Sequence, residues 1–219
     1  MVASREIIKV ATELLQQPKI TERMMALEYL GCIFVSNDLQ LVNWSIERGL
    51  YTSMQEILEP HQKVGLIHAC LFCLSNIAAG SKKQVKRLIE EEIIINLVVQ
   101  HAYSPKSIIA GESMWVLCNI VTIAKPEDRI NFLRIYSSDL VHVLIHWIEY
   151  NASKAGEARV TLEVLNTLIK LLQIEVVYPD EFTTHESSVR YMIDEVAGFS
   201  AIEKLTIGDK HEQEICEKS

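Results

Sequence analysis

The sequence is poor in the residues that interrupt helices. Only eight glycines and five prolines occur in 219 residues, which is typical of helices joined by short turns. Strict alternation of apolar and polar residues, the pattern of a half-buried strand, is not sustained anywhere along the chain. Because 49% of the residues are hydrophobic, the chain can bury a continuous core, and its composition is not that of a disordered protein. We therefore expect an all-α protein.

Other features that the sequence lacks argue against several classes of function. No apolar run reaches the roughly 18 residues that span a bilayer, and the first residues lack the apolar stretch of a signal peptide, so we expect no membrane partner. The net charge of −8 argues against direct binding of nucleic acid, which needs Lys and Arg, and is compatible with a basic polypeptide partner. A phosphate-binding glycine loop and a nucleophile elbow are both missing. We expect neither an enzyme nor a cofactor.

The cysteines are odd in number, five, at positions 32, 70, 73, 118 and 216. The first four fall within apolar helical patterns, which favours reduced thiols in a cytosolic or nuclear protein. Cys70 and Cys73 have zinc-like spacing, but both lie inside one apolar helical pattern and no second pair exists. His142 and His146 could hold a metal, yet Val143 stands where a metalloprotease helix has its Glu. No metal site is expected.

One local pattern recurs through the chain at nearly constant spacing. Three copies carry an Asn at the same place, and a weaker first copy has Cys32 there; successive copies of this position are 44, 43 and 47 residues apart. A period of about 40–47 residues with only helical patterns between the copies indicates an armadillo or HEAT solenoid, which is a class of binding scaffold. The copies are 25–33 (MALEYLGCI), 69–77 (ACLFCLSNI), 112–120 (ESMWVLCNI) and 161–168 (TLEVLNTL).

Each period divides into a short, a medium and a long helical segment, separated by Gly, Pro, Asn or Ser. Three helices in a period favour the armadillo arrangement over the two-helix HEAT arrangement. We therefore expect a right-handed armadillo-repeat superhelical solenoid without β-strands. The predicted helices are 5–15, 21–35, 38–48, 50–58, 63–79, 82–91, 92–101, 107–123, 127–136, 138–150, 155–173, 186–197 and 199–206, with breaks at Ser137-Ser138 and Gly198 among others.

The whole chain, 1–219, is expected to form a single array of about four repeats with partial ends. Residues 174–185, which contain Pro179, are predicted to form a loop before the last partial repeat. The final residues, from His211, begin a helix without a cap, and the first helix begins almost at Met1. Because a solenoid with uncapped ends exposes core surface, we expect the sequence to be a piece of a longer array.

The repeated segments carry a specific resemblance. Residues 69–80 (ACLFCLSNIAAG) and 112–119 (ESMWVLCN) resemble the long-helix signature of importin-α, the nuclear import adaptor, which has the form Glu-Ala-x-Trp-x-x-Ser-Asn-Ile-x-x-Gly. The similarity extends through 37–40, 162–172 and 198–205, and so covers nearly the whole chain, from the middle of the family's sixth repeat into its tenth. The resemblance implies an adaptor that binds basic nuclear localisation peptides, has import and export karyopherins as partners, and is found in the cytoplasm and the nucleus.

The resemblance also implies that the family's smaller peptide site corresponds to Phe72, Asn76, Glu112, Trp115 and Asn119. The residue types suit that task. An aromatic residue and an Asn four positions apart share one helix face. The amide can pair with a peptide's backbone N–H and C=O whatever its sequence, and aromatic rings in neighbouring repeats form slots for Lys or Arg stems. Glu112, three residues before Trp115, would select for charge.

Each of these residues has a plainer interpretation. Phe72 and Trp115 could belong to the core, and Glu112 could be a solvated helix residue. An Asn in such a position can be structural, bonding the backbone of a neighbouring turn. We favour that role for Asn166, because its partner position is Leu162, which builds no aromatic slot.

The chain departs from the importin-α pattern in its first copy. Glu28 stands where the family commonly has Arg, Cys32 replaces the Asn, and Ala69 takes the place of the acidic residue before the second slot. Phe72 replaces the usual Trp. Two functions therefore remain open, a nuclear import adaptor fragment that binds basic peptides in a concave groove, and a diverged armadillo scaffold that holds another protein outside nuclear import.

Overall fold

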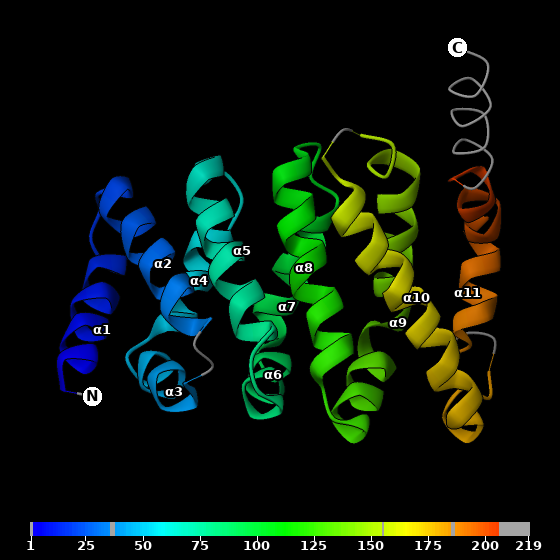
Figure 1. The fold of residues 1–219 in the computed structure, drawn as a ribbon, viewed down its shortest axis with the longest axis horizontal. Coiled ribbons are helices and arrows are strands. Elements are labelled where there is room, and N and C mark those ends of the chain that lie inside the picture. The colour runs from blue at the N-terminus through cyan, green and yellow to red at the C-terminus, as the bar shows by residue number, and fades with distance from the viewer. Residues whose placement is uncertain (1, 36–37, 155, 185–186, 206–219) are drawn as a thin grey trace, which may run out of the picture. The chain divides into compact units, whose positions relative to one another are not determined.

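The computed structural model describes residues 2–35, 38–154, 156–184 and 187–205 (Figure 1). These residues form α-helices, one short 3-10 helix and connecting turns, and none of them forms a β-strand. Within these ranges no helix combines the length and the apolarity that a bilayer crossing requires. The elements are α1 (Val2–Leu15), α2 (Ile20–Phe34), α3 (Leu39–Glu47), α4 (Leu50–Leu58), α5 (Val64–Ala78), α6 (Lys82–Ile89), α7 (Glu92–Ala102), α8 (Ser107–Ile123), α9 (Pro126–Tyr150), α10 (Ala158–Val177), the 3-10 helix η1 (Pro179–Glu181) and α11 (Val189–Glu195).

The short helices begin at side-chain caps. The Asp38 carboxylate accepts hydrogen bonds from the backbone N–H groups of Gln40 and Leu41 and so starts α3. Ser81 and Gln84 form a reciprocal capping box at the start of α6. Gly49, with φ of 87°, makes the left-handed turn between α3 and α4. Local side-chain and backbone chemistry thus sets the boundaries of α3, α4 and α6.

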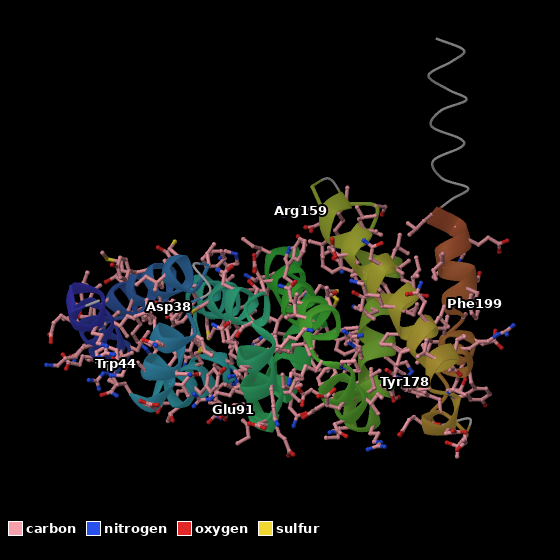
Figure 2. All side chains as sticks on the ribbon, turned by 60° about the horizontal axis from the view of Figure 1, so that its bottom comes forward. Asp38, Trp44, Glu91, Arg159, Tyr178 and Phe199 are labelled. Carbon is pink, nitrogen blue, oxygen red and sulfur yellow. The ribbon has the colours of Figure 1, made fainter. Side chains whose placement is uncertain are left out.

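The end of α3 also carries a contact between an exposed arginine and a half-buried tryptophan. The Arg48 guanidinium carbon lies 3.9 Å from the centre of the Trp44 ring, which is a cation–π geometry. Trp44 is labelled in Figure 2. This tryptophan therefore lies on a different element from the one predicted to form a peptide slot.

The chain divides into two compact units, Met1–Phe132 and Leu133–Ser219, with the boundary inside α9. In the first unit the long helices α2, α5 and α8 pack side by side in order (Figure 1). Each also packs against the medium helix that precedes it, namely α1, α4 and α7. The sets α3–α4–α5 and α6–α7–α8 therefore repeat the short, medium and long order that the sequence predicted.

Hydrogen bonds between the sets join residues one period apart. Arg87 Nη1 on α6 donates to Asn43 Oδ1 on α3 at 2.7 Å, across 44 positions. His101 Nε2 on α7 lies 2.8 Å from the Leu58 carbonyl oxygen on α4, across 43 positions. Equivalent helices of successive repeats are thus in direct contact, as in a solenoid in which each repeat packs on its neighbours.

The second unit contains the rest of α9, then α10, η1 and α11. Trp147 on α9 is fully buried, and its Nε1–H donates to Thr161 Oγ1 on α10 at 3.1 Å. The Glu175 carboxylate accepts the Ser188 hydroxyl at 2.6 Å and the Arg190 backbone N–H at 3.1 Å, which ties the start of α11 to α10.

Three predicted boundaries are wrong. Ser137 and Ser138 do not interrupt the helix, since α9 runs through them from Pro126 to Tyr150. Helix α10 continues to Val177, so the predicted loop of 174–185 begins only after that residue and contains η1. Gly198 does not end a helix; it begins the helical stretch 198–205, and the left-handed residue is Ala197, with φ of 54°. The predicted helix from His211 lies outside the described residues.

Candidate peptide-binding face

The five predicted site residues lie on two neighbouring long helices of the first unit. Phe72 and Asn76 belong to α5, and Glu112, Trp115 and Asn119 belong to α8. All five are half-buried, neither inside the core nor fully solvated. Because α5 and α8 pack directly together, the structure brings the five into one region, which we call the α5/α8 face. Asn166 lies on α10 in the second unit and is half-buried as well.

The two asparagines make the same bond one repeat apart. Asn76 Nδ2 donates to the Gly31 carbonyl oxygen of α2, and Asn119 Nδ2 donates to the Ser75 carbonyl oxygen of α5, each at 3.2 Å. The two acceptors are equivalent positions, 44 residues apart. Both carbonyls also accept the N–H four residues on in their own helix, from Val35 and Ala79. Each amide therefore links its long helix to the preceding one.

Glu112 points from α8 toward α5. The Ser75 hydroxyl lies 3.3 Å from Glu112 Oε2 and 2.9 Å from the Phe72 carbonyl oxygen. A hydroxyl has one proton to donate, so these two acceptors compete for it. His68 Nε2 lies 3.9 Å from Glu112 Oε1. The carboxylate is thus held between residues 68 and 75 of α5, which share a face with Phe72 at helical spacing.

Burial raises the pKa of the Glu112 carboxyl above its ordinary value of 4.5, and the nearby His68 and the Ser75 hydroxyl lower it in part. The side chain keeps only 20% of its exposure. A carboxylate in such a place is less stable as an anion than one in water. A ligand cation placed beside it would favour the charged form.

Phe72 packs closely on the preceding repeat. A Cβ added to Gly31 would come within 2.8 Å of Phe72 Cε1, so the ring lies directly over the backbone of α2. Gly31 is therefore required for this approach. His68, Ser75 and Gly31 are site residues that the sequence interpretation missed, because their contacts cross between helices and leave no spacing signal within one helix.

The two cysteines with zinc-like spacing are packed inside α5. Cys70 and Cys73 are fully buried, and burial raises the pKa of both thiols, which keeps them protonated. Zinc binds the thiolate form. Among the described residues no group of three or more His, Cys, Asp or Glu side chains is arranged to hold a metal ion.

The repeated helix order and the one-period bonds between equivalent helices decide the fold class. The chain has an armadillo-repeat fold. The all-α armadillo prediction is therefore confirmed. No protein-family model and no curated protein matches the sequence.

Solved structures agree with this fold. A designed armadillo-repeat protein in complex with the peptide (KR)4 is similar at a TM-score of 0.53 and 21% identity, over 89% of this chain and 90% of that chain. A computationally designed armadillo-repeat protein for modular peptide recognition is similar at 0.59 and 14%, over 91% and 92%. An engineered protein is similar at 0.63 and 16%, over 97% and 88%. At these low sequence identities, the structural similarity supports the fold alone.

Proposed function

We propose that the chain is a non-enzymatic binding scaffold that holds an extended basic peptide on the α5/α8 face. The observation that carries the proposal is the position of Glu112. Its carboxylate lies in a partly desolvated place and competes with a backbone carbonyl for a single hydroxyl proton. A Lys or Arg of a ligand would add a charged donor to a carboxylate whose present partners are a shared hydroxyl and His68.

The neighbouring side chains suit an extended peptide. Phe72 and Trp115 are half-buried, so each has ring surface against which an aliphatic stem can lie. Asn76 and Asn119 each use one N–H on the preceding repeat. The amide oxygen and the second N–H of each are the groups that would pair with a peptide backbone.

The net charge of the chain and its similarity to a solved structure also support the proposal. The net charge of −8 favours a basic ligand, and a similar designed armadillo protein has been solved in complex with the peptide (KR)4. The finer proposal is a nuclear import adaptor, with nuclear localisation peptides as ligands, karyopherins as partners, and residence in the cytoplasm and the nucleus. It rests on the resemblance of 69–80 and 112–119 to importin-α.

The test is a titration of the protein with a fluorescently labelled Lys/Arg peptide and with an acidic peptide of equal length. We expect saturable binding of the basic peptide alone. Trp115→Ala should weaken it by about 2 kcal/mol, because a slot wall and its cation–π contribution are lost. Trp44→Ala, which removes a tryptophan from α3, is the matched control and should leave the affinity unchanged.

A folded Trp115→Ala protein that binds the basic peptide like the parent would show that the α5/α8 face is not the site. Failure of the parent to bind the peptide would favour the second candidate function, a scaffold for another protein outside nuclear import. That candidate is favoured by α2, where Glu28 and Cys32 are exposed at the positions of Phe72 and Asn76. The first repeat thus lacks the aromatic and amide pair.

A further inference from the structure

The aromatic ring of Phe72 lies at the junction between α2 and α5. A Cβ added to Gly31 would come within 2.8 Å of Phe72 Cε1 and 2.9 Å of Phe72 Cδ1, so the ring lies against the backbone of α2. One turn later on α5, Asn76 Nδ2 donates to the Gly31 carbonyl oxygen at 3.2 Å. These two contacts hold α2 against α5 at Gly31 and place the ring beside the surface of α2.

Glu28 lies one helical turn before Gly31 on α2 and is exposed. Residues three apart are neighbours on a helix surface, with Cβ positions about 5–6 Å apart. Glu28 is therefore close to the place where the Phe72 ring meets α2. Within the described part of the chain, no cationic side chain lies within ion-pairing distance of Glu28. Its carboxylate is open to a ligand.

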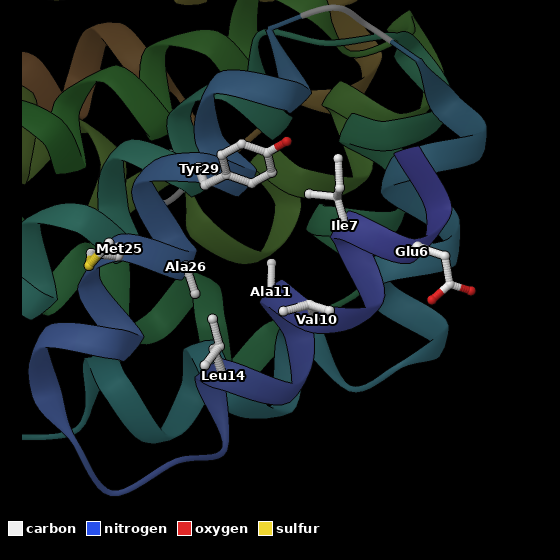
Figure 3. Close-up of a pocket in the computed structure, with 8 residues that line it drawn as sticks. All are labelled: Glu6, Ile7, Val10, Ala11, Leu14, Met25, Ala26 and Tyr29. Carbon is white, nitrogen blue, oxygen red and sulfur yellow. The ribbon is translucent and has the colours of Figure 1, made fainter. Parts of the chain in front are cut away.

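Glu28 lies on the side of α2 that faces α5, and not on the side that faces α1. Met25, Ala26 and Tyr29 line an apolar hollow together with residues of α1, whereas Glu28 does not line it (Figure 3). At 3.6 residues per turn, Glu28 is about 60° around the helix from Gly31, and Tyr29 is about 160° from it. The α2/α5 junction, and not the outer surface of α2, therefore gives access to Glu28.

Two carboxylates thus flank Phe72 from neighbouring helices. Glu112 approaches α5 from α8, where the Ser75 hydroxyl lies 3.3 Å from its Oε2, and Glu28 lies on α2. On α5 itself the position equivalent to Glu112 is Ala69, 43 residues earlier, which is uncharged and 2% exposed. The acidic residue that α5 lacks at this position is replaced, across the junction, by an acidic residue of α2.

We propose that Glu28 and Phe72 form a second cation site, which we call the α2/α5 site, one repeat away from Glu112 and Trp115. This inference rests on the proposed function, because it requires an extended basic peptide on the α5/α8 face. The stem of a Lys or Arg lies along the Phe72 ring, and its charged group pairs with Glu28. The ligand is therefore a peptide with two basic residues at a fixed spacing, and not simply any basic peptide.

Helix packing sets that spacing. One site lies at the α2/α5 junction and the other at the α5/α8 junction, so one distance between packed helices, about 8–10 Å, separates them. A peptide in the polyproline II conformation rises about 3.1 Å per residue with three residues per turn, so its residues i and i+3 lie on one side about 9 Å apart. Adjacent residues are only about 3.8 Å apart at their Cα atoms. We therefore expect basic residues at i and i+3.

The probes are fluorescently labelled Ser/Gly peptides of equal length with neutral ends. One carries Lys at i and i+3, the second carries Lys at i and i+1, and the third carries a single Lys. Glu28→Lys reverses the charge of the α2/α5 site. Glu56→Lys, at an exposed residue of α4, is the matched control, because it changes the net charge by the same amount and so accounts for long-range repulsion of a cationic peptide. Glu112→Gln tests the site on α8.

We expect the parent and Glu56→Lys to bind the i, i+3 peptide with a Kd about threefold or more below that of the i, i+1 peptide, since an exposed ion pair contributes modestly. Glu28→Lys should abolish this preference, so that the two Kd values become equal. Glu28→Gln gives the same readout should Glu28→Lys not fold.

Equal Kd values of the two peptides for the parent, or a preference that persists in both Glu28 variants, overturns the inference. If Glu112→Gln nevertheless weakens all three peptides, the proposed function stands without the α2/α5 site. If the parent binds none of the peptides, or if Glu112→Gln has no effect on any of them, the proposed function fails and the α2/α5 site fails with it.

Discussion

Asn76 and Asn119 have a structural role in addition to the binding role that we propose for them. Each amide donates one hydrogen bond to the preceding long helix, so the structural role that we had reserved for Asn166 is present at both predicted binding residues. The amide oxygen and the second N–H of each residue can form hydrogen bonds either with water or with a ligand. Substitution at these positions therefore has to be measured for stability and for affinity separately.

Asn76→Ala should lower the free energy of unfolding by about 0.5–1 kcal/mol, because the inter-helix bond is lost while Gly31 keeps its bond from Val35. Chemical denaturation measures the change. Asn96→Ala replaces an exposed Asn of α7 and is the control; it should be neutral or slightly stabilising through helix propensity. An equal effect of the two substitutions would contradict the role assigned to Asn76.

Glu112→Gln tests the raised pKa of this carboxyl. Burial raises the folded-state pKa of Glu112 above the ordinary 4.5, so the folded state favours the protonated carboxyl. The contribution of this group to the free energy of unfolding is therefore fully present at low pH and is lost as the pH rises through the folded-state pKa. The neutral variant does not titrate there. We therefore expect the difference in the free energy of unfolding between the variant and the parent to shift in favour of the variant as the pH rises from 4 to 7. Denaturation at several pH values measures this difference.

The same substitution should weaken the binding of a basic peptide at a pH above the folded-state pKa of Glu112, where the parent carboxylate is charged, and should have little effect on affinity at pH 4. Glu56→Gln, at an exposed residue of α4, is the control and should show neither behaviour. A Glu112→Gln protein whose stability relative to the parent is independent of pH would show that burial does not govern this group.

At the scale of the element, α9 shows where local signals mislead. Ser137 and Ser138 suggested a break because serine favours turns, yet the helix continues through them. Serine is only a modest helix breaker, and fully or nearly fully buried apolar residues on both sides, among them Phe132, Tyr136 and Leu140, keep helical spacing across the pair. Packing of that face outweighs the local preference.

Ser138→Pro separates a continuous α9 from two helices. In a continuous helix the ring removes a backbone hydrogen bond and clashes with the preceding turn, so we expect a loss of about 3 kcal/mol or more in the free energy of unfolding. Ser138→Ala should change it by a few tenths of a kcal/mol at most. Urea denaturation compares the two; a proline variant as stable as the alanine variant would mean that the chain does break at this point.

Gly198 is a second element boundary that the sequence could not place. Glycine after a helix predicts a left-handed C-cap, but Ala197 adopts that conformation instead. A Cβ on Gly198 would lie 2.8 Å from Ile145 and 2.9 Å from Ile193. The glycine is thus explained by close packing inside the second unit, and a tertiary contact of this kind leaves no local trace in the sequence.

At the scale of the whole molecule, the period was the decisive signal. Its regularity predicted the armadillo fold because equivalent residues such as Gly31 and Ser75 must meet the same partners in successive repeats. The period could also place Phe72 and Trp115 on equivalent faces. It could not show that His68 and Ser75 surround Glu112, because that contact depends on how far apart two packed helices lie.

The chain should not be uniformly stable. Helix α8 has ten buried residues, whereas η1 has none and α11 is a helix of seven residues. Amide hydrogen exchange should therefore be faster in residues after Val177 than in 107–123, since exchange follows local opening where few apolar contacts are made. Mass spectrometry of peptic fragments measures it. Equal protection of the two regions would contradict this expectation.

The most direct test of the proposed function is a crystal structure of the protein with a bound Lys/Arg peptide. We predict an extended peptide whose backbone lies against Asn76 and Asn119, with a basic side chain directed to Glu112 beside Phe72 or Trp115. A peptide bound on any other surface of the molecule, or bound as a helix, would contradict the assignment of the α5/α8 face.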